Sequence, residues 1–120
     1  MSWKDKYDHI GDFSEGLANV GLKGKSGYKY GYVDKTGKVV VPIIYDFIGD
    51  FQEGLAWVEL KDKQGFVDKT GKVVTPIIYD DIGLFSEGLA WVELKGKQGF
   101  VDKTGKVVKG QKDLIRGCFE

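Results

Sequence analysis

The side chains of this sequence that could do nucleophilic or acid–base chemistry are one cysteine, one histidine and a set of recurring carboxylates. A catalytic thiol needs a base held beside it, so Cys118 would depend on His9, the single histidine. One cysteine also permits neither an intramolecular disulfide nor a thiolate metal cluster. We therefore expect Cys118 to be an inert thiol and His9 to be exposed.

The carboxylates recur in equivalent places, which points to turns and not to a reaction centre. Aspartates occupy one turn position in three copies, and glutamates followed by glycine occupy another. An aspartate can accept backbone N–H bonds in a turn, and this role explains each copy. Asp80-Asp81 lacks the spaced acidic loop of a calcium site, so a solvated turn is expected there. The sequence thus predicts no catalytic, metal or cofactor site; the recurring acids are Asp34, Asp68, Asp102, Glu15, Glu53 and Glu87.

These acids sit in a repeated decapeptide and its flanks. GFVDKTGKVV stands at 65–74 and again at 99–108, with GYVDKTGKVV at 31–40, so successive copies are 34 residues apart. A fixed period of this size indicates a repeat architecture. The decapeptide predicts strand, turn, strand, with Asp68 accepting backbone N–H bonds and Gly71 taking positive φ.

The flanking segments recur as well. YDHIGDFSEGLA at 7–18 has counterparts at 45–56 and 79–90, and its mixed spacing predicts a connection with a short turn or single helical turn. LAWVEL at 55–60 alternates as a strand does, and the KDKQ that follows predicts a tight turn of the primed kind. Each unit is therefore expected to be a three-stranded antiparallel meander, with middle-unit strands at about 55–60, 64–68 and 72–78.

The fold class predicted is all-β, with three tandem repeats stacked as an elongated array in one domain, 1–120. The units are expected at about 7–44, 45–78 and 79–112, with 1–6 and 109–120 as terminal caps or tails. Closure about a pseudo-threefold axis, as a barrel or propeller-like arrangement, is the alternative. Trp3 is expected to cover the open end of the core.

Composition limits the partners. Lys plus Arg and Asp plus Glu number 18 each, so no net field recruits nucleic acid or an anionic membrane. No apolar run approaches the roughly 20 residues of a membrane span, and the N-terminal sequence lacks the apolar core of a signal peptide. We expect a soluble chain whose localisation is unknown.

The combined pattern resembles the WG (KWG, tryptophan-glycine) repeat family. The residues that carry the resemblance are F-S-E-G-L-A, then V, then G-K-x-G-F/Y-V-D-K-T-G-K-V-V and P-x-x-Y-D, from Tyr7 to about Val108. The tryptophan that names the family precedes the glycine of the second strand, and Tyr30, Gln64 and Gln98 hold that place here. The resemblance implies an all-β interaction or binding module without a settled activity.

Function is therefore expected to be non-enzymatic binding, with a protein or peptide as partner. The first hairpin is four residues longer than the others and carries three tyrosines, which either pack on themselves or form a binding loop. The repeated tryptophans either line a surface or pack between units. The candidate binding surface is Trp57, Trp91, Tyr28, Tyr30 and Tyr32.

Three alternatives stay open. A tryptophan and tyrosine strip would suit a glycan or cell-envelope polymer, and the near-identity of the last two repeats would suit a structural spacer. The open array would also allow self-association through sheet edges. Lysines gather at the hairpin tips, where they either contact a polyanion or keep the edges soluble; they are Lys35, Lys38, Lys69, Lys72, Lys103, Lys106, Lys61, Lys63, Lys95 and Lys97.

Overall fold

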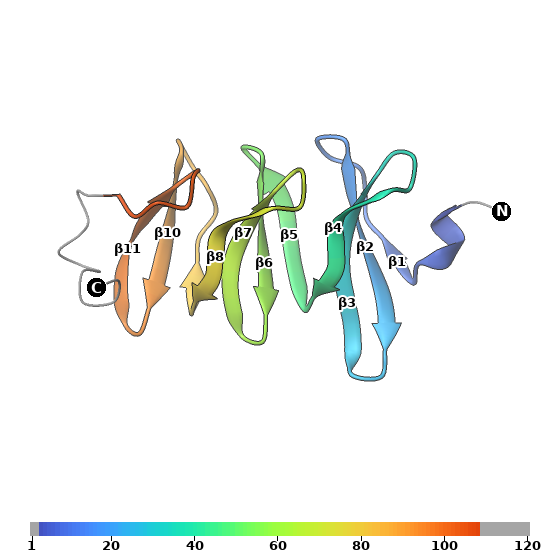
Figure 1. Cartoon of the computed structure of the whole chain (residues 1–120), viewed down its shortest axis with the longest axis horizontal. Coiled ribbons are helices and arrows are strands. Elements are labelled where there is room, and N and C mark those ends of the chain that lie inside the picture. The colour runs from blue at the N-terminus through green and yellow to red at the C-terminus, as the bar shows by residue number, and fades with distance from the viewer. Residues whose placement is uncertain (1–2, 109–120) are drawn as a thin grey trace.

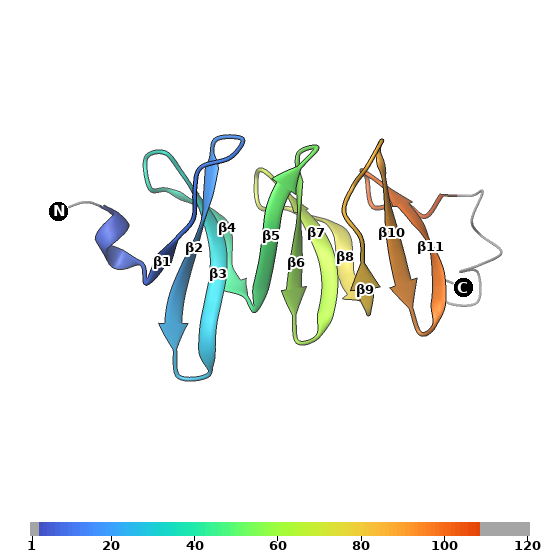
Figure 2. The same ribbon diagram turned by 180° about the vertical axis from the view of Figure 1, so that it is seen from behind.

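Three antiparallel sheets stand in a row in the computed structural model, which describes residues 3–108 (Figures 1 and 2). The molecule measures 55 × 31 × 17 Å, so the predicted elongated array of three repeats is confirmed and closure into a barrel is wrong. The sheets run in the orders β1-β2-β3-β4, β5-β6-β7-β8 and β9-β10-β11. Their elements are η1 Trp3–Lys6, β1 His9–Ile10, β2 Leu17–Gly24, β3 Gly27–Asp34, β4 Val39–Tyr45, β5 Phe47–Gln52, β6 Leu55–Leu60, β7 Lys63–Asp68, β8 Val73–Tyr79, β9 Asp81–Ile82, β10 Leu89–Leu94 and β11 Lys97–Asp102.

The middle sheet has four strands and not the three expected. The additional strand is β5, in the segment 45–56 that the sequence predicts to be a connection. β5 pairs antiparallel with β6, placing Phe47 opposite Glu59 and Ile48 opposite Val58. The register then shifts before Phe51. This irregularity breaks the alternation of side chains, and for that reason the strand leaves no clean period of two in the sequence. β1 and β9 are shorter versions of the same strand.

The turns follow the predicted chemistry. Lys61 and Asp62 have φ of 53° and 69°, so the β6–β7 turn is of the primed type. In the DKTG turn, Asp68 accepts bonds from the backbone N–H of Thr70 at 2.9 Å and of Lys72 at 3.1 Å. Gly71 has φ of 89°, as the sequence requires.

Apolar clusters fill both junctions, a junction being the interface between two consecutive sheets. At the first, the rings of Tyr32 and Phe51 meet edge to face with centroids 4.7 Å apart. At the second, Phe66 and Phe85 meet in the same way at 4.5 Å. The middle sheet therefore uses one face toward the preceding unit and the other toward the next.

The DKTG turns dock each sheet on the one before it. A Cβ built on Gly71 would overlap the carbonyl oxygen of Val40, and one on Gly105 would overlap that of Val74. At the first sheet, which has no preceding sheet in this chain, the ring of Trp3 lies against the equivalent Gly37. Trp3 therefore occupies the place that a preceding strand would take. Its short helix η1 lies at the N-terminal end of the row (Figure 1).

Glutamates of the EG turns also tie the units together. Glu53 accepts bonds from the backbone N–H of Glu87 and of Gly88, both at 3.1 Å. Its carboxylate also lies 3.5 Å from the ammonium of Lys103, and Glu15 lies 2.9 Å from Lys69. Because these ion pairs are exposed, each contributes little to stability. No helix within residues 3–108 has the length and apolar character that crossing a membrane requires.

Candidate functional site

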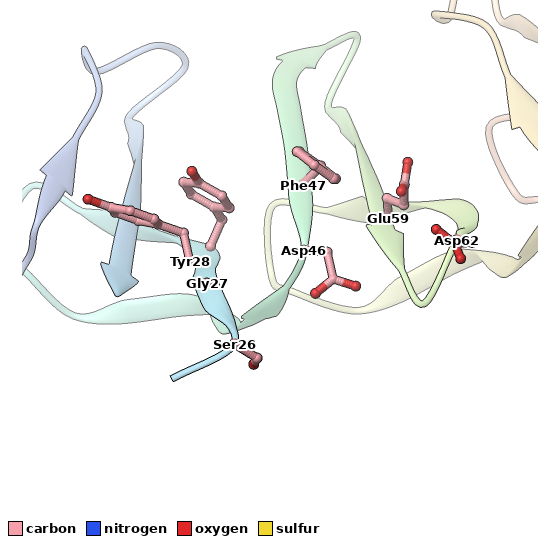
Figure 3. A pocket seen from close by; sticks show the side chains of 8 residues that line it. Ser26, Gly27, Tyr28, Asp46, Phe47, Glu59 and Asp62 are labelled. Carbon is pink, nitrogen blue, oxygen red and sulfur yellow. The ribbon is translucent and has the colours of Figure 1, made fainter. Parts of the chain in front are cut away.

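A groove lies at the first junction, between the long β2–β3 hairpin and strands β5 and β6 (Figure 3). It consists of two hollows of about 440 and 230 Å³ that share the walls formed by Tyr30 and Phe47. We call this feature the Tyr30 groove. The larger hollow is lined by Ser26, Gly27, Tyr28, Tyr30, Asp46, Phe47, Glu59 and Asp62, and the smaller one by His9, Asn19, Tyr30, Phe47 and Ile48.

Aromatic side chains form one wall of the groove. Tyr28 and Tyr30 stack with centroids 5.9 Å apart and planes 15° from parallel. The ring of His9 meets Tyr30 edge to face at 6.1 Å, and its Nε2 lies 2.8 Å from Oδ1 of Asn19. Phe47 of β5, across the hollow from the tyrosines (Figure 3), is 56% exposed, a high value for a phenylalanine. The groove therefore offers aromatic rings to a ligand from both sides.

Carboxylates form the opposite wall, as Figure 3 shows for Asp46, Glu59 and Asp62. The Lys29 ammonium pairs with Asp46 and holds the pKa of that carboxyl below its usual range, and the backbone N–H of Lys61 adds to the effect. Glu59 accepts a bond from Nε2 of Gln64 at 2.9 Å, which fixes its position. The wall thus carries negative charge, with Asp46 and Glu59 held by hydrogen-bonding partners.

Asn19, which borders the smaller hollow, holds the place that a tryptophan has in the other two units. The equivalent Trp57 packs against the apolar cluster of the second junction, with its Cβ and Cε3 3.4 Å from where a Cβ of Gly49 would lie. There the isoleucine of the next sheet, Ile82, is 7% exposed, whereas its counterpart Ile48 at the first junction is only half-buried. A shorter side chain at position 19 therefore leaves open the space that an indole fills one unit later.

The longer first hairpin supplies the rest of the wall. β2 and β3 have eight residues each, whereas β6, β7, β10 and β11 have six. Tyr28 lies in this extension and has no counterpart in the shorter hairpins. The four additional residues thus place the aromatic side chain of Tyr28 at the groove, and the shorter hairpins have no such side chain.

The predicted binding surface is only partly assembled. Tyr28 and Tyr30 meet in the groove, whereas Tyr32 is 3% exposed and donates its hydroxyl to the carbonyl of Gly49. Including Tyr32 in the surface is wrong, because its side chain packs into the junction core. Burial first, and Asp50 second, raise the pKa of the Tyr32 hydroxyl. Trp57 lies in the second junction and Trp91 on β10, so neither joins the tyrosines.

Sequence reasoning misses the other half of the groove. The sequence pattern singles out none of Phe47, Asn19 and Glu59 as a site residue, and it marks Asp62 only as part of the KDKQ turn. A signal is present, because the repeats differ at these places: Phe47 corresponds to Asp81, and Asn19 to Trp57. In a repeat protein, positions where one unit departs from the others mark a feature that only one junction has.

The structure also bears on the other residues considered for catalysis or metal binding. His9 is exposed, as expected. Within residues 3–108, no group of three or more histidine, cysteine, aspartate or glutamate side chains is arranged to hold a metal ion. Cys118 and the expected tail 109–120 lie outside the described residues.

The position directly after Tyr30 is a glycine in each repeat, and the structure explains why. A Cβ on Gly31 would overlap the carbonyl oxygen of Val41, and one on Gly65 would meet that of Thr75, because the last strand of each sheet crosses close to this position. The register between β3 and β4 shifts at the same place. A glycine is therefore required there, directly after the residue that faces the groove.

Comparison with family models agrees with this pattern. The model described as WG containing repeat matches residues 6–25, 30–63 and 65–97. No curated protein and no solved structure matches the chain. Because the three family matches together span well over half of the sequence, the chain belongs to the WG-containing repeat family.

Proposed function

We propose that this protein is a non-enzymatic interaction module that binds a protein or peptide segment in the Tyr30 groove. The repeats supply a rigid scaffold, and the departures of the first unit from the repeat pattern supply the site. The observation that carries the proposal is the pairing of an exposed Phe47 with stacked Tyr28 and Tyr30 across a hollow of about 440 Å³. Aromatic side chains of this kind are enriched where proteins bind one another.

The dimensions of the groove support a short segment as the ligand. Its two hollows adjoin at Tyr30 and Phe47, which line both, and an elongated ligand that passes these side chains would contact both. Pockets for small ligands commonly fall between about 300 and 1,000 Å³, and the larger hollow alone accommodates one or two side chains. A ligand that covers these exposed rings removes their apolar surface from water, which stabilises the complex.

A selection experiment tests the proposal. Random peptides of about twelve residues, displayed on phage, would be selected on the wild-type protein, and the binders tested on Tyr30→Gln, the residue found at the equivalent Gln64. We expect peptides that bind the wild type and lose about tenfold or more in affinity on Tyr30→Gln, as for an aromatic anchor. Trp91→Phe, on the third sheet, serves as the matched control and should bind normally.

Other results would contradict the proposal. If no peptide is enriched, or if enriched peptides bind Tyr30→Gln as well as the wild type, the groove is not a peptide site. Oligosaccharides that bind while peptides do not would support the glycan alternative. A protein that binds neither would be left with the role of a structural spacer.

A further inference from the structure

We propose that the Tyr30 groove selects a segment that carries an arginine side chain, an inference that rests on the binding function proposed above. The lining of the larger hollow contributes three carboxylates, those of Asp46, Glu59 and Asp62, and no cationic side chain. Lys29 pairs with Asp46 from outside the lining and offsets one of these charges. An excess of negative charge therefore remains on the wall that faces the tyrosines.

The other two carboxylates differ in how they are held. Gln64 fixes Glu59 through a bond of 2.9 Å, and Asp62 stands at the tip of the β6–β7 turn with φ of 69°. Both belong to the second unit, whereas Tyr28 and Tyr30 opposite them belong to the first. A ligand between them is thus contacted by both sheets, and acidic segments are repelled.

The aromatic wall suits a guanidinium in particular. Tyr28 and Tyr30 are stacked nearly in parallel, and the exposed rings of Tyr28 and Phe47 are open to a ligand. A planar guanidinium can lie on such faces while its N–H groups point toward carboxylates. An ammonium lacks the planar shape and the fork of donors, so lysine should bind less well.

The second junction shows that this combination is not a property of every repeat. Gln64 replaces Tyr30 there, Asp81 replaces Phe47, and Gly96 replaces Asp62. Trp57 fills the space beneath. The aromatic wall does not recur, although the two junctions join equivalent strands and the second junction has carboxylates of its own, those of Asp80, Asp81 and Glu93. The chemistry is therefore specific to the first junction.

Matched peptides test this inference in solution. The probes are acetylated and amidated Val-Arg-Val, its isosteric citrulline counterpart and its glutamate counterpart, titrated into ¹⁵N-labelled protein by NMR. We expect Val-Arg-Val to shift the amide signals of Tyr28, Tyr30 and Phe47 with about fivefold higher affinity than the citrulline peptide. The glutamate peptide should leave these signals in place.

Two variants separate charge from shape. Asp62→Gly adopts the residue found at Gly96 and suits the positive φ of that turn, so the fold should persist. We expect it to weaken Val-Arg-Val by about threefold and to leave the citrulline peptide unaffected. Asp81→Asn, which removes one carboxylate at the second junction and keeps its bond to the N–H of Ile82, should have no effect.

The failures are distinguishable. If arginine and citrulline peptides bind the groove equally and Asp62→Gly changes neither, selection for a cation is wrong while binding in the groove stands. If no arginine peptide shifts the groove signals, selection for arginine is also wrong. Failure of the phage selection, by contrast, would contradict binding itself.

Discussion

Asn19 and Trp57 occupy the same position of two equivalent strands, and the shorter side chain borders a hollow whereas the longer one packs against an apolar cluster. Trp57 packs against the cluster between the second and third sheets, beside Gly49. Asn19 lies against Gly11 and lines the smaller hollow of the Tyr30 groove. One position thus separates a structural junction from a candidate binding junction.

Replacing Trp57 should therefore cost stability. Trp57→Asn removes a half-buried indole from the second junction and should lower the free energy of unfolding by about 2 kcal/mol, less than for a fully buried tryptophan. Urea unfolding followed by circular dichroism measures it. Trp57→Phe, which keeps an aromatic ring, is the control and should lose less. Equal stability of Trp57→Asn and the wild type would show that the indole does not fill this junction.

Two features should require glycine at position 71 of the DKTG turn: its positive φ and the close contact with the preceding sheet. Gly71→Ala places a methyl group against the carbonyl of Val40 in the preceding sheet, at φ of 89°. Gly54→Ala has nearly the same φ of 82° but nothing within 4 Å. We expect Gly54→Ala to cost about 1 kcal/mol and Gly71→Ala about 2 kcal/mol or more in urea unfolding. Equal losses would mean that docking of the turn is not tight.

Thr75 should be a stabilising site for mutation. Its side chain is fully buried, and its hydroxyl has no hydrogen-bond partner among the described residues. The first sheet has Val41 at the equivalent position, equally buried. Thr75→Val should raise the free energy of unfolding by about 1 kcal/mol, and Val41→Thr should lower it by a similar amount. Thermal melts of both variants check the prediction, and a destabilised Thr75→Val would contradict it.

Acid should weaken the fold through the DKTG turns. The hydroxyl of Thr36 and the N–H groups of Thr36 and Lys38 hold the pKa of Asp34 below its ordinary value, and Thr104 does the same for Asp102. A carboxyl whose pKa is lower in the folded state contributes stability above its unfolded pKa, about 3.9, and this contribution is lost as pH falls through the folded pKa. The melting temperature should therefore drop below about pH 4.

The same melts identify the groups responsible. Asp34→Asn and Thr36→Val should each lower the melting temperature at neutral pH and make its fall on acidification less steep, because each removes part of the hydrogen bonding that favours the carboxylate. An acid profile that neither substitution changes would place the acid sensitivity in other carboxylates.

The sequence predicts the repeated parts of this fold and does not predict the parts that arise between units. The turns at Asp68 and Gly71 are predictable because their chemistry is local. The added strand β5 is not, because its pairing with β6 shifts register and so erases the alternation. Tyr32 is wrongly expected on the surface because the sequence does not say which face of a strand meets the next sheet.

The candidate site is predictable only in part for the same reason. Tyr28 can be found because it lies in a visible insertion, and Tyr30 because it stands where the other two units have Gln64 and Gln98. Phe47 and Glu59 come to the groove through stacking of the second sheet on the first, and no local pattern encodes that proximity. A comparison of equivalent positions in the three units, by contrast, draws attention to Asn19 and Phe47 from the amino-acid sequence alone.

The most direct test of the binding site is the affinity of a selected peptide for the wild type and for Asn19→Trp, measured by isothermal titration calorimetry. The substitution copies the residue that fills the second junction, so the protein should keep its fold and its melting temperature should not fall. We predict that the filled groove loses at least about tenfold in affinity. Unchanged affinity in a folded Asn19→Trp protein would contradict the claim that the Tyr30 groove is the binding site.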